Sequence, residues 1–322
     1  MIQAMGQTVT KVSVITAAYN CSSHIERVVD SVRRQSIVDW EMLIVDDAST
    51  DNTFEVALRI AAEDQRIKVW RQQVNSGPSA ARNRGINSAK GEWVTILDAD
   101  DTLRPQRLER LLEVAHETGV DVVADNLVKF DDIANQEGDT SFEFFGSRMT
   151  MMDLLDSEIA RDRPSFALLK PMIRRSVLMD NDIRYREDLR FAEDLFLYSE
   201  LLLSGYEFAL LNEALYLYTT QMGEISNQKS TATRTHFTPE TRVWIADELL
   251  RLYEDRMSED VIERLAEFRS FSVEYTMAHR ISLYRHSKQY PQMIGLMVTE
   301  PRAAVRFAKT LRPIRKLLGT SW

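Results

Sequence analysis

The first hundred residues alternate between short apolar runs and segments in which apolar residues recur at helical spacing. Four runs end abruptly in polar residues, which predicts buried strands over residues 12–17, 41–45, 67–70 and 94–97. Helices are predicted between them, with inward faces formed first by Ile25, Val28, Val29 and Val32 and then by Phe54, Ala57, Leu58 and Ala61. Because strands and helices alternate, we expect an α/β fold with a mostly parallel sheet flanked by helices.

Local end signals predict several element boundaries. Ser22 or Ser23 should cap the first helix, and Pro78 should begin a helix after the turn at residues 75–77. A further strand is expected over residues 120–124, and the polar stretch 131–139 lacks periodicity and predicts a loop. A later helix should begin near Glu193 and end before Gly205, because glycine suits the position just past a helix.

The pattern from Thr238 onward is helical throughout. We therefore divide the chain into an N-terminal tail (residues 1–10), an α/β domain (11–228) and a C-terminal helical region (229–322). The helical region either packs on the domain or serves self-association as a homo-oligomer. Its end, residues 302–322, holds six basic residues and no acidic one at amphipathic spacing, which indicates either a solvated helix face or contact with anionic lipid.

Composition narrows the class of protein further. The 322 residues are 44% hydrophobic and 28% charged, as in an ordinary soluble protein, and the net charge of -9 argues against nucleic-acid binding. Cys21 is the only cysteine, so a disulfide framework is excluded, as expected of a reducing compartment. Since no leader-like segment and no run of about 18 apolar residues occurs, we expect a cytoplasmic protein that does not span a membrane.

Three carboxylates follow the strand at residues 94–97 directly. Asp98, Asp100 and Asp101 should repel one another at neutral pH unless a cation or many donors lie among them. Oxygen ligands without His or Cys suit Mg2+ or Mn2+, shared with a substrate phosphate. The alternative is an acidic turn in which Asp101 or Thr102 caps the next helix.

A second acidic strand end, Asp46 and Asp47, should lie at the same edge of the sheet, because parallel strands end together. Tyr19 and the helix start at Gly77 would add an aromatic face and free backbone N–H groups to this crevice. Such groups suit a nucleoside diphosphate. Neither a dinucleotide-binding glycine fingerprint nor a P-loop sequence occurs. Taken singly, Tyr19 could equally be a core residue.

Glu193 and Asp194 fall in the first turn of their predicted helix. The helix dipole favours their ionised form there, which a general base requires. The alternative is ordinary charge compensation at a helix N-terminus.

Four segments together resemble the successive motifs of the family 2 inverting glycosyltransferases. They are residues 14–20 (VITAAYN), 45–51 (VDDASTD), 75–77 (NSG) with 81–85 (ARNRG), and 97–101 (LDADD). The resemblance covers roughly residues 10–225 and implies a GT-A fold over the α/β domain, a sugar-nucleotide donor such as a UDP-sugar, and Mg2+ or Mn2+ as cofactor. The family commonly has Pro at the position of Ala17.

The resemblance also implies roles for individual residues. The nucleotide would lie against Ala17, Tyr19, Asp47, Arg82 and Asp98, and the metal would be held by Asp100 and Asp98, with Asp101 a further candidate. Asp194 would be the catalytic base toward the acceptor hydroxyl and Glu193 its support. The basic residue that often follows the tyrosine pair at Tyr216 and Tyr218 is replaced by Thr219 and Thr220.

The activity implied is transfer of one sugar per acceptor, because the Gln-x-x-Arg-Trp motif of processive relatives is absent. Similarity to bacterial exopolysaccharide enzymes of the succinoglycan type implies glucose as the sugar. It also implies a saccharide acceptor carried on a lipid such as undecaprenyl diphosphate, and peripheral contact with the cytoplasmic face of the inner membrane. A nucleotidylyltransferase and a non-catalytic sugar-nucleotide-binding scaffold remain the alternatives.

Overall fold

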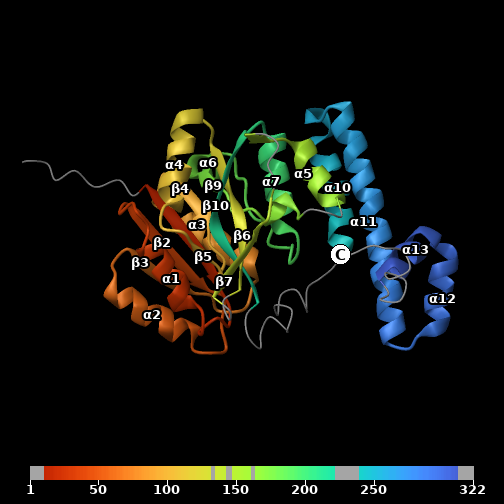
Figure 1. Ribbon diagram of the computed structural model, residues 1–322, viewed down its shortest axis with the longest axis horizontal. Helices are drawn as coiled ribbons and strands as arrows, with labels where there is room; N and C mark the ends of the chain where they lie inside the picture. The colour runs from red at the N-terminus through yellow and green to blue at the C-terminus, as the bar shows by residue number, and fades with distance from the viewer. Residues whose placement is uncertain (1–10, 132–134, 143–146, 161–163, 222–238, 311–322) are drawn as a thin grey trace, which may run out of the picture. The chain divides into compact units, whose positions relative to one another are not determined.

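The computed structural model describes residues 11–131, 135–142, 147–160, 164–221 and 239–310. The chain divides into two compact units, Met1–His236 and Phe237–Trp322. The first unit contains the sheet and the second contains helices (Figure 1). Each unit is described by itself below.

The described part of the first unit contains a ten-stranded mixed sheet in the order β3-β2-β1-β4-β9-β6-β10-β5, with β7 on β6 and β8 on β10. The strands are β1 (Val12–Ala18), β2 (Trp40–Asp46), β3 (Ile67–Arg71), β4 (Trp93–Ile96), β5 (Thr102–Leu103), β6 (Val122–Asp131), β7 (Gln136–Thr140), β8 (Arg148–Met149), β9 (Met172–Arg174) and β10 (Phe208–Gln221). The four predicted strands of the first hundred residues, and the one expected after residue 120, are confirmed.

Helices connect these strands. They are α1 (Ile25–Arg33), α2 (Thr53–Glu63), α3 (Pro78–Ser88), α4 (Arg107–Thr118), α5 (Met151–Ile159), α6 (Arg175–Asp180) and α7 (Glu193–Leu203), with a 3-10 turn η1 (Phe166–Leu168). Pro78 is the first residue of α3, and α7 is followed by Gly205 at φ +89°, as predicted.

The parallel half of the sheet brings three loops to one edge. β1 pairs in parallel with β2 on one side and β4 on the other, and β2 pairs in parallel with β3. β2 and β4 lie on opposite sides of β1, so the connection through α3 runs across the sheet in the opposite direction from those through α1 and α2. Since such crossovers are right-handed, α3 lies on the opposite face of the sheet from α1 and α2. The loops that follow β1, β2 and β4 therefore lie together at the carboxyl edge, where ligands bind in open α/β sheets.

Four local predictions were wrong. Leu58 is 46% exposed, and Ile60 occupies the buried face of α2 instead, one turn after Ala57. The residue before α1 is His24, and neither Ser22 nor Ser23 caps the helix. Thr102 belongs to β5, so it caps no helix.

The fourth wrong prediction is the loop at residues 131–139. Residues 136–140 form β7, which pairs antiparallel with the end of β6. All five residues of β7 are exposed, so the strand is held by backbone pairing at the sheet edge and leaves no apolar pattern in the sequence.

The second unit contains α10 (Glu240–Tyr253), the 3-10 turn η2 (Glu254–Arg256), α11 (Glu259–His286), α12 (Tyr290–Thr299) and α13 (Pro301–Thr310). Ala278 and Ile281 of α11 pack with Ala303 and Phe307 of α13 in a small core. The amphipathic stretch predicted from Arg302 thus buries its apolar face within this unit, and its remainder, residues 311–322, lies outside the described residues. Across the described helices, none combines the length and apolar character needed to cross a membrane.

Candidate active site

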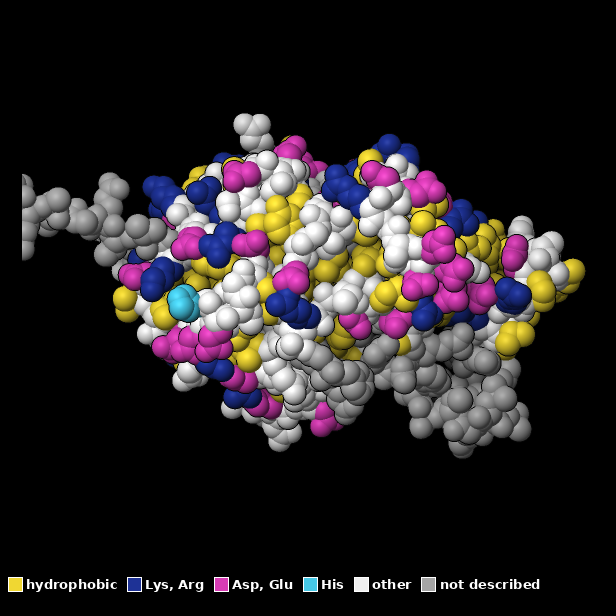
Figure 2. All heavy atoms as spheres, turned by 90° about the horizontal axis from the view of Figure 1, so that it is seen from above, with side chains coloured by type: hydrophobic (Ala, Val, Ile, Leu, Met, Phe, Trp, Pro, Cys, Tyr) yellow, Lys and Arg dark blue, Asp and Glu magenta, His cyan; other side chains and the backbone are white. Residues whose placement is uncertain are grey.

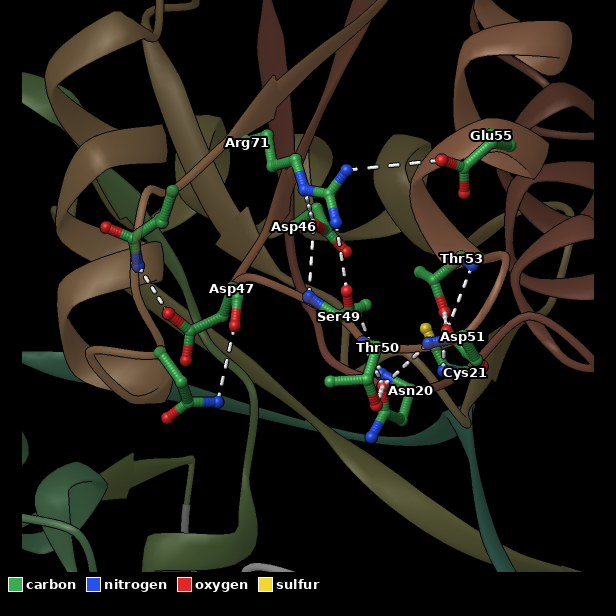
Figure 3. Close-up of polar contacts among 12 residues, drawn as sticks. Asn20, Cys21, Asp46, Asp47, Ser49, Thr50, Asp51, Thr53, Glu55 and Arg71 are labelled. Atoms are coloured by element: carbon green, nitrogen blue, oxygen red, sulfur yellow. Dashed lines mark hydrogen bonds and ion pairs between the residues drawn. The ribbon is translucent and has the colours of Figure 1, made fainter.

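The loops after β1 and β2 are tied together by side-chain hydrogen bonds (Figure 3). Asn20 adopts a left-handed backbone at φ +50°, and its Oδ1 accepts the Thr50 N–H at 2.8 Å. Asp51 accepts the Ser22 N–H at 3.2 Å. Tyr19 is 39% exposed beside this network, so its ring is available at the sheet edge.

Asp47 holds the turn that leads into α3. Its Oδ1 accepts the Ser76 N–H at 2.8 Å and the Gln72 side chain at 2.7 Å, and its Oδ2 accepts the Gly77 N–H at 2.7 Å. Gly77 has φ +93°, a conformation that glycine adopts without strain. The carboxylate predicted to contact the nucleotide therefore also shapes the loop that borders the crevice.

Asp98, at the end of β4, lies between two buried cations. Arg82 of α3 donates to its Oδ1 at 3.0 Å, and the Lys170 Nζ is 3.2 Å from its Oδ2. Burial alone would raise the pKa of Asp98, but the charges of Lys170 and Arg82 lower it to about 2. Arg82 is 5% exposed, and its guanidinium reaches across the site from Asp98 to Glu193.

Asp100 and Asp101 are adjacent but their surroundings differ. Burial and the charge of Asp98 raise the pKa of Asp100 to about 6, and no ion pair from the described residues neutralises it. Asp101 is fully enclosed, accepting the Tyr216 hydroxyl at 2.7 Å and the Thr219 N–H at 2.8 Å. Asp101 thus anchors β10 to the β4 loop, and both its oxygens are already occupied.

Glu193 and Asp194 begin α7 and point to the same cluster. Glu193 accepts from Arg82 at 2.7 Å. Asp194 accepts from the Lys170 Nζ through Oδ2 at 2.8 Å, whereas its buried Oδ1 has no hydrogen-bond partner and only a 3.8 Å ion-pair contact with Arg82 Nη1. An unsatisfied buried carboxylate oxygen is costly, so this atom is suited to accept a hydrogen bond from a ligand.

The structure thus brings together Arg82, Asp98, Glu193 and Asp194, which the resemblance selected, and adds Lys170, which it did not. Lys170 lies between η1 and β9 and is 5% exposed. In the sequence it is one lysine before a proline, and its partners Asp98 and Asp194 are distant along the chain. Only the fold reveals it.

The donor set fits a divalent cation that shares its ligands with a diphosphate. Within the described residues, no group of three or more His, Cys, Asp or Glu side chains could hold a metal alone. Asp98 already neutralises Arg82 and Lys170, whereas Asp100 offers a carboxylate that a nearby positive charge would stabilise. Among the described residues, Asp100 is therefore a carboxylate whose surroundings suit a nearby cation.

Several known proteins are similar to this chain. ExoO, the succinoglycan biosynthesis protein of Rhizobium meliloti, is 34% identical over 226 residues, which cover 68% of this chain and 63% of ExoO. The GalNAc(5)-diNAcBac-PP-undecaprenol beta-1,3-glucosyltransferase of Campylobacter jejuni is 34% identical over 152 residues, 47% of this chain and 46% of that protein. The match thus spans less than two thirds of each of these relatives.

Among solved structures, S. aureus TarS residues 1–349 in complex with UDP-GlcNAc aligns with a TM-score of 0.67 at 24% identity. The alignment covers 91% of this chain and 81% of the TarS chain, and it confirms the GT-A fold. The sequence profile of glycosyl transferase family 2 matches residues 13–178, just over half of the chain. On this evidence, the chain belongs to glycosyl transferase family 2.

Proposed function

We propose that this glycosyltransferase inverts the donor linkage and transfers one sugar, glucose, from a UDP-sugar to a saccharide acceptor in exopolysaccharide synthesis. The observation that carries the chemistry is the buried Oδ1 of Asp194, which accepts no hydrogen bond and has only a 3.8 Å ion-pair contact with Arg82 Nη1, beside Asp98 and its two cations. The name of ExoO supports a role in polysaccharide synthesis. The name of the C. jejuni glucosyltransferase supports glucose as the transferred sugar and a lipid-linked acceptor. The UDP-GlcNAc complex of TarS supports the donor class.

In this mechanism the acceptor hydroxyl donates its proton to Asp194 Oδ1 while its oxygen forms a bond to the anomeric carbon of the donor sugar. The bond from that carbon to the diphosphate oxygen breaks, and the nucleoside diphosphate leaves with the electron pair. Arg82 fixes Glu193 and Asp98 on either side of this path. A divalent cation bound at Asp100 would supply positive charge for the leaving diphosphate.

The test has a binding part and a turnover part. UDP at about 100 times its Kd should stabilise the fold by roughly 2.7 kcal/mol in the presence of Mn2+, and GDP, dTDP and CDP should not. Asp194→Asn should lower turnover about 100-fold or more and leave the UDP shift intact. Turnover within a few-fold of wild type would remove Asp194 from the mechanism, and a response to none of the diphosphates would favour the scaffold alternative.

A nucleotidylyltransferase would use similar acidic metal ligands but would release pyrophosphate from a nucleoside triphosphate. The Asp194 Oδ1, which accepts no hydrogen bond, favours the glycosyltransferase, because a base for an acceptor hydroxyl has no counterpart in attack by a sugar phosphate, which is already ionised. Release of UDP from a UDP-sugar, dependent on Asp100, separates the two activities.

We also propose that the second unit rests on the cytoplasmic face of an anionic membrane. Tyr290, Ile294 and Val298 recur every four residues along α12 and are 51%, 57% and 76% exposed, which forms an apolar stripe. In Figure 2, hydrophobic side chains are exposed in the part of the view that corresponds to α12 and α13 in Figure 1. A continuous exposed stripe of this kind marks a docking surface more often than isolated apolar residues do.

The charges around the stripe are complementary to anionic lipid. Arg285, Lys288 and Arg302, which flank α12 in the sequence, are exposed, and each basic residue close to an anionic lipid surface contributes about 1 kcal/mol. Ile294→Glu with Val298→Glu should reduce co-sedimentation with phosphatidylglycerol vesicles, whereas Val38→Glu, on the first unit, should not. Unchanged binding refutes the proposal, and loss of a dimer in the double variant would instead identify a self-association surface.

A further inference from the structure

Lys170 forms a bridge between the two halves of the active site. Its ammonium is 2.8 Å from Asp194 Oδ2, at the start of α7, and 3.2 Å from Asp98 Oδ2, at the end of β4. An ammonium has three donors and no acceptor, so one lysine can satisfy both carboxylates at once. A single side chain therefore connects the carboxylate proposed for the acceptor with the carboxylate proposed for the donor.

The charge of Lys170 is retained although the side chain is buried. Burial would lower the pKa of Lys170, but the carboxylates of Asp194 and Asp98 raise it above its usual value. The fixed ammonium occupies only Oδ2 of Asp194. Because that oxygen is held, the second oxygen, Oδ1, has a defined direction, and it accepts no hydrogen bond although Arg82 Nη1 lies 3.8 Å away.

We propose that Lys170 is a positioning residue, which orients Asp194 through Oδ2 so that Oδ1 receives the proton of the acceptor hydroxyl. This inference rests on the proposed glycosyl transfer and assigns a role to a residue outside the family motifs. Lys170 acts through Asp194 and makes no contact with the sugar itself. Rotation of the Asp194 carboxylate would misplace Oδ1, and a displacement of about 1 Å in a reacting group can cost about 100-fold in rate.

The backbone of Lys170 is held independently of its ammonium. The guanidinium of Arg107, which is fully buried, donates to the Lys170 carbonyl. The Leu169 carbonyl accepts the Tyr198 hydroxyl at 2.6 Å. Loss of the ammonium should therefore leave the chain in place around residue 170, which makes Lys170→Met a suitable test of the side chain alone.

The decisive experiment is a double-mutant cycle between Lys170→Met and Asp194→Asn in the full-length chain. The assay is release of UDP from UDP-glucose, UDP-galactose and UDP-N-acetylglucosamine in the presence of Mn2+. Lys170→Met should lower kcat about 100-fold with little change in the donor KM. In the Asp194→Asn background, Lys170→Met should have almost no further effect, because there is no base left to position.

Two outcomes would overturn the inference. If the losses multiply in the double variant, Lys170 acts independently of Asp194. If the donor KM rises while kcat is kept, Lys170 serves donor binding through Asp98. Lys170→Arg should not restore full activity, because a planar guanidinium cannot place one nitrogen between both carboxylates as the ammonium does.

A matched control separates this role from loss of any buried ion pair. Lys68 Nζ is 2.7 Å from Glu41 Oε2 at the opposite edge of the sheet, so Lys68→Met breaks a lysine–carboxylate pair of similar length, although the Lys68 side chain is 38% exposed, and should keep kcat. Thermal unfolding provides a second measure, because Lys170→Met leaves Arg82 as the remaining cation beside Asp98 and Asp194 and should lower the Tm, and Asp194→Asn should partly restore it. Absence of UDP release by the wild type would refute the proposed function itself, whereas active wild type with active Lys170→Met refutes only the role of Lys170.

Discussion

The buried pair of Arg107 and Asp125 gives the most quantitative prediction, because both side chains have no exposed surface. The Arg107 Nε is 3.0 Å and 3.1 Å from the two Asp125 oxygens, and Nη2 is 2.8 Å from Oδ1. Nη1 donates to Thr95 at 3.3 Å, and Nη2 also donates to the Lys170 carbonyl. This one guanidinium thus joins α4, β4, β6 and the segment that carries Lys170.

Arg107→Met leaves the Asp125 carboxylate buried without a counter-charge, which costs about 3–5 kcal/mol. In a unit of this size, 1 kcal/mol shifts the Tm by about 2–4 °C, so the transition of the first unit should fall by about 6–20 °C. Replacing both partners by apolar residues, Arg107→Met with Asp125→Leu, should recover most of the loss. Differential scanning calorimetry measures both variants.

The result that would refute this reasoning is a double variant as unstable as the single one. The cost would then come from lost packing and not from the uncompensated charge. A single variant that loses less than about 1 kcal/mol would mean that Asp125 takes up a proton easily, since burial already raises the pKa of Asp125 despite the charge of Arg107.

Two further predictions concern stability. Burial would raise the pKa of Glu41, but Lys68, the Lys90 N–H and Ser13 lower it below its usual value. The ionised Glu41 therefore stabilises the fold above about pH 4, and this stabilisation is lost as the pH falls. In urea unfolding, Glu41→Gln should lower the free energy of unfolding strongly at pH 7 and only slightly below about pH 4. An equal loss at both pH values would refute the stabilising role of the ionised Glu41. Gly85→Ala should destabilise α3 by about 1–3 kcal/mol despite the better helix propensity of alanine, because the new Cβ would be 2.4 Å from Ile15 Cγ2. A neutral or stabilising effect in the same assay would contradict it.

The sequence predicts the parallel half of the sheet well because β1, β2 and β4 are buried on both faces and read as apolar runs. β7 escapes prediction because its residues are polar and exposed, and only pairing with β6 holds it. Leu58 was assigned to the wrong face because Ile60 competes for the same stripe. The apolar pattern thus predicts helices and buried strands, whereas the pairing of strands and the packing of side chains decide whether a polar strand forms and which residues are buried.

The residues of the candidate site likewise include some that a local sequence pattern predicts and some that only the fold reveals. Motifs select Arg82, Asp98 and Asp194 because they carry the spacing of the family, and the structure brings them within ion-pair distance. Lys170 carries no local signal, because it acts through partners far away in the chain. The sequence also treats Asp98, Asp100 and Asp101 as one acidic group, although the fold gives each a different environment.

That difference between neighbours can be tested directly with Asp100→Ala and Asp101→Ala. Removal of Asp101 leaves the Tyr216 hydroxyl and the Thr219 N–H without an acceptor, so it should destabilise the first unit by about 1–3 kcal/mol for each group. Removal of Asp100 relieves repulsion with Asp98, so stability should be kept or increased.

Metal-dependent binding of UDP should show the opposite pattern. In thermal-shift titrations, Asp100→Ala should abolish the additional stabilisation that Mn2+ gives to the UDP complex. Asp101→Ala should retain that stabilisation at temperatures where the variant is folded, because its carboxylate already bonds within the protein and has no free oxygen for a metal. Equal loss in both variants would mean that the two carboxylates bind the metal together. The distinction between Asp100 as metal ligand and Asp101 as the residue that holds β10 would then be wrong. β10 would have to shift when the metal binds in order to release Asp101.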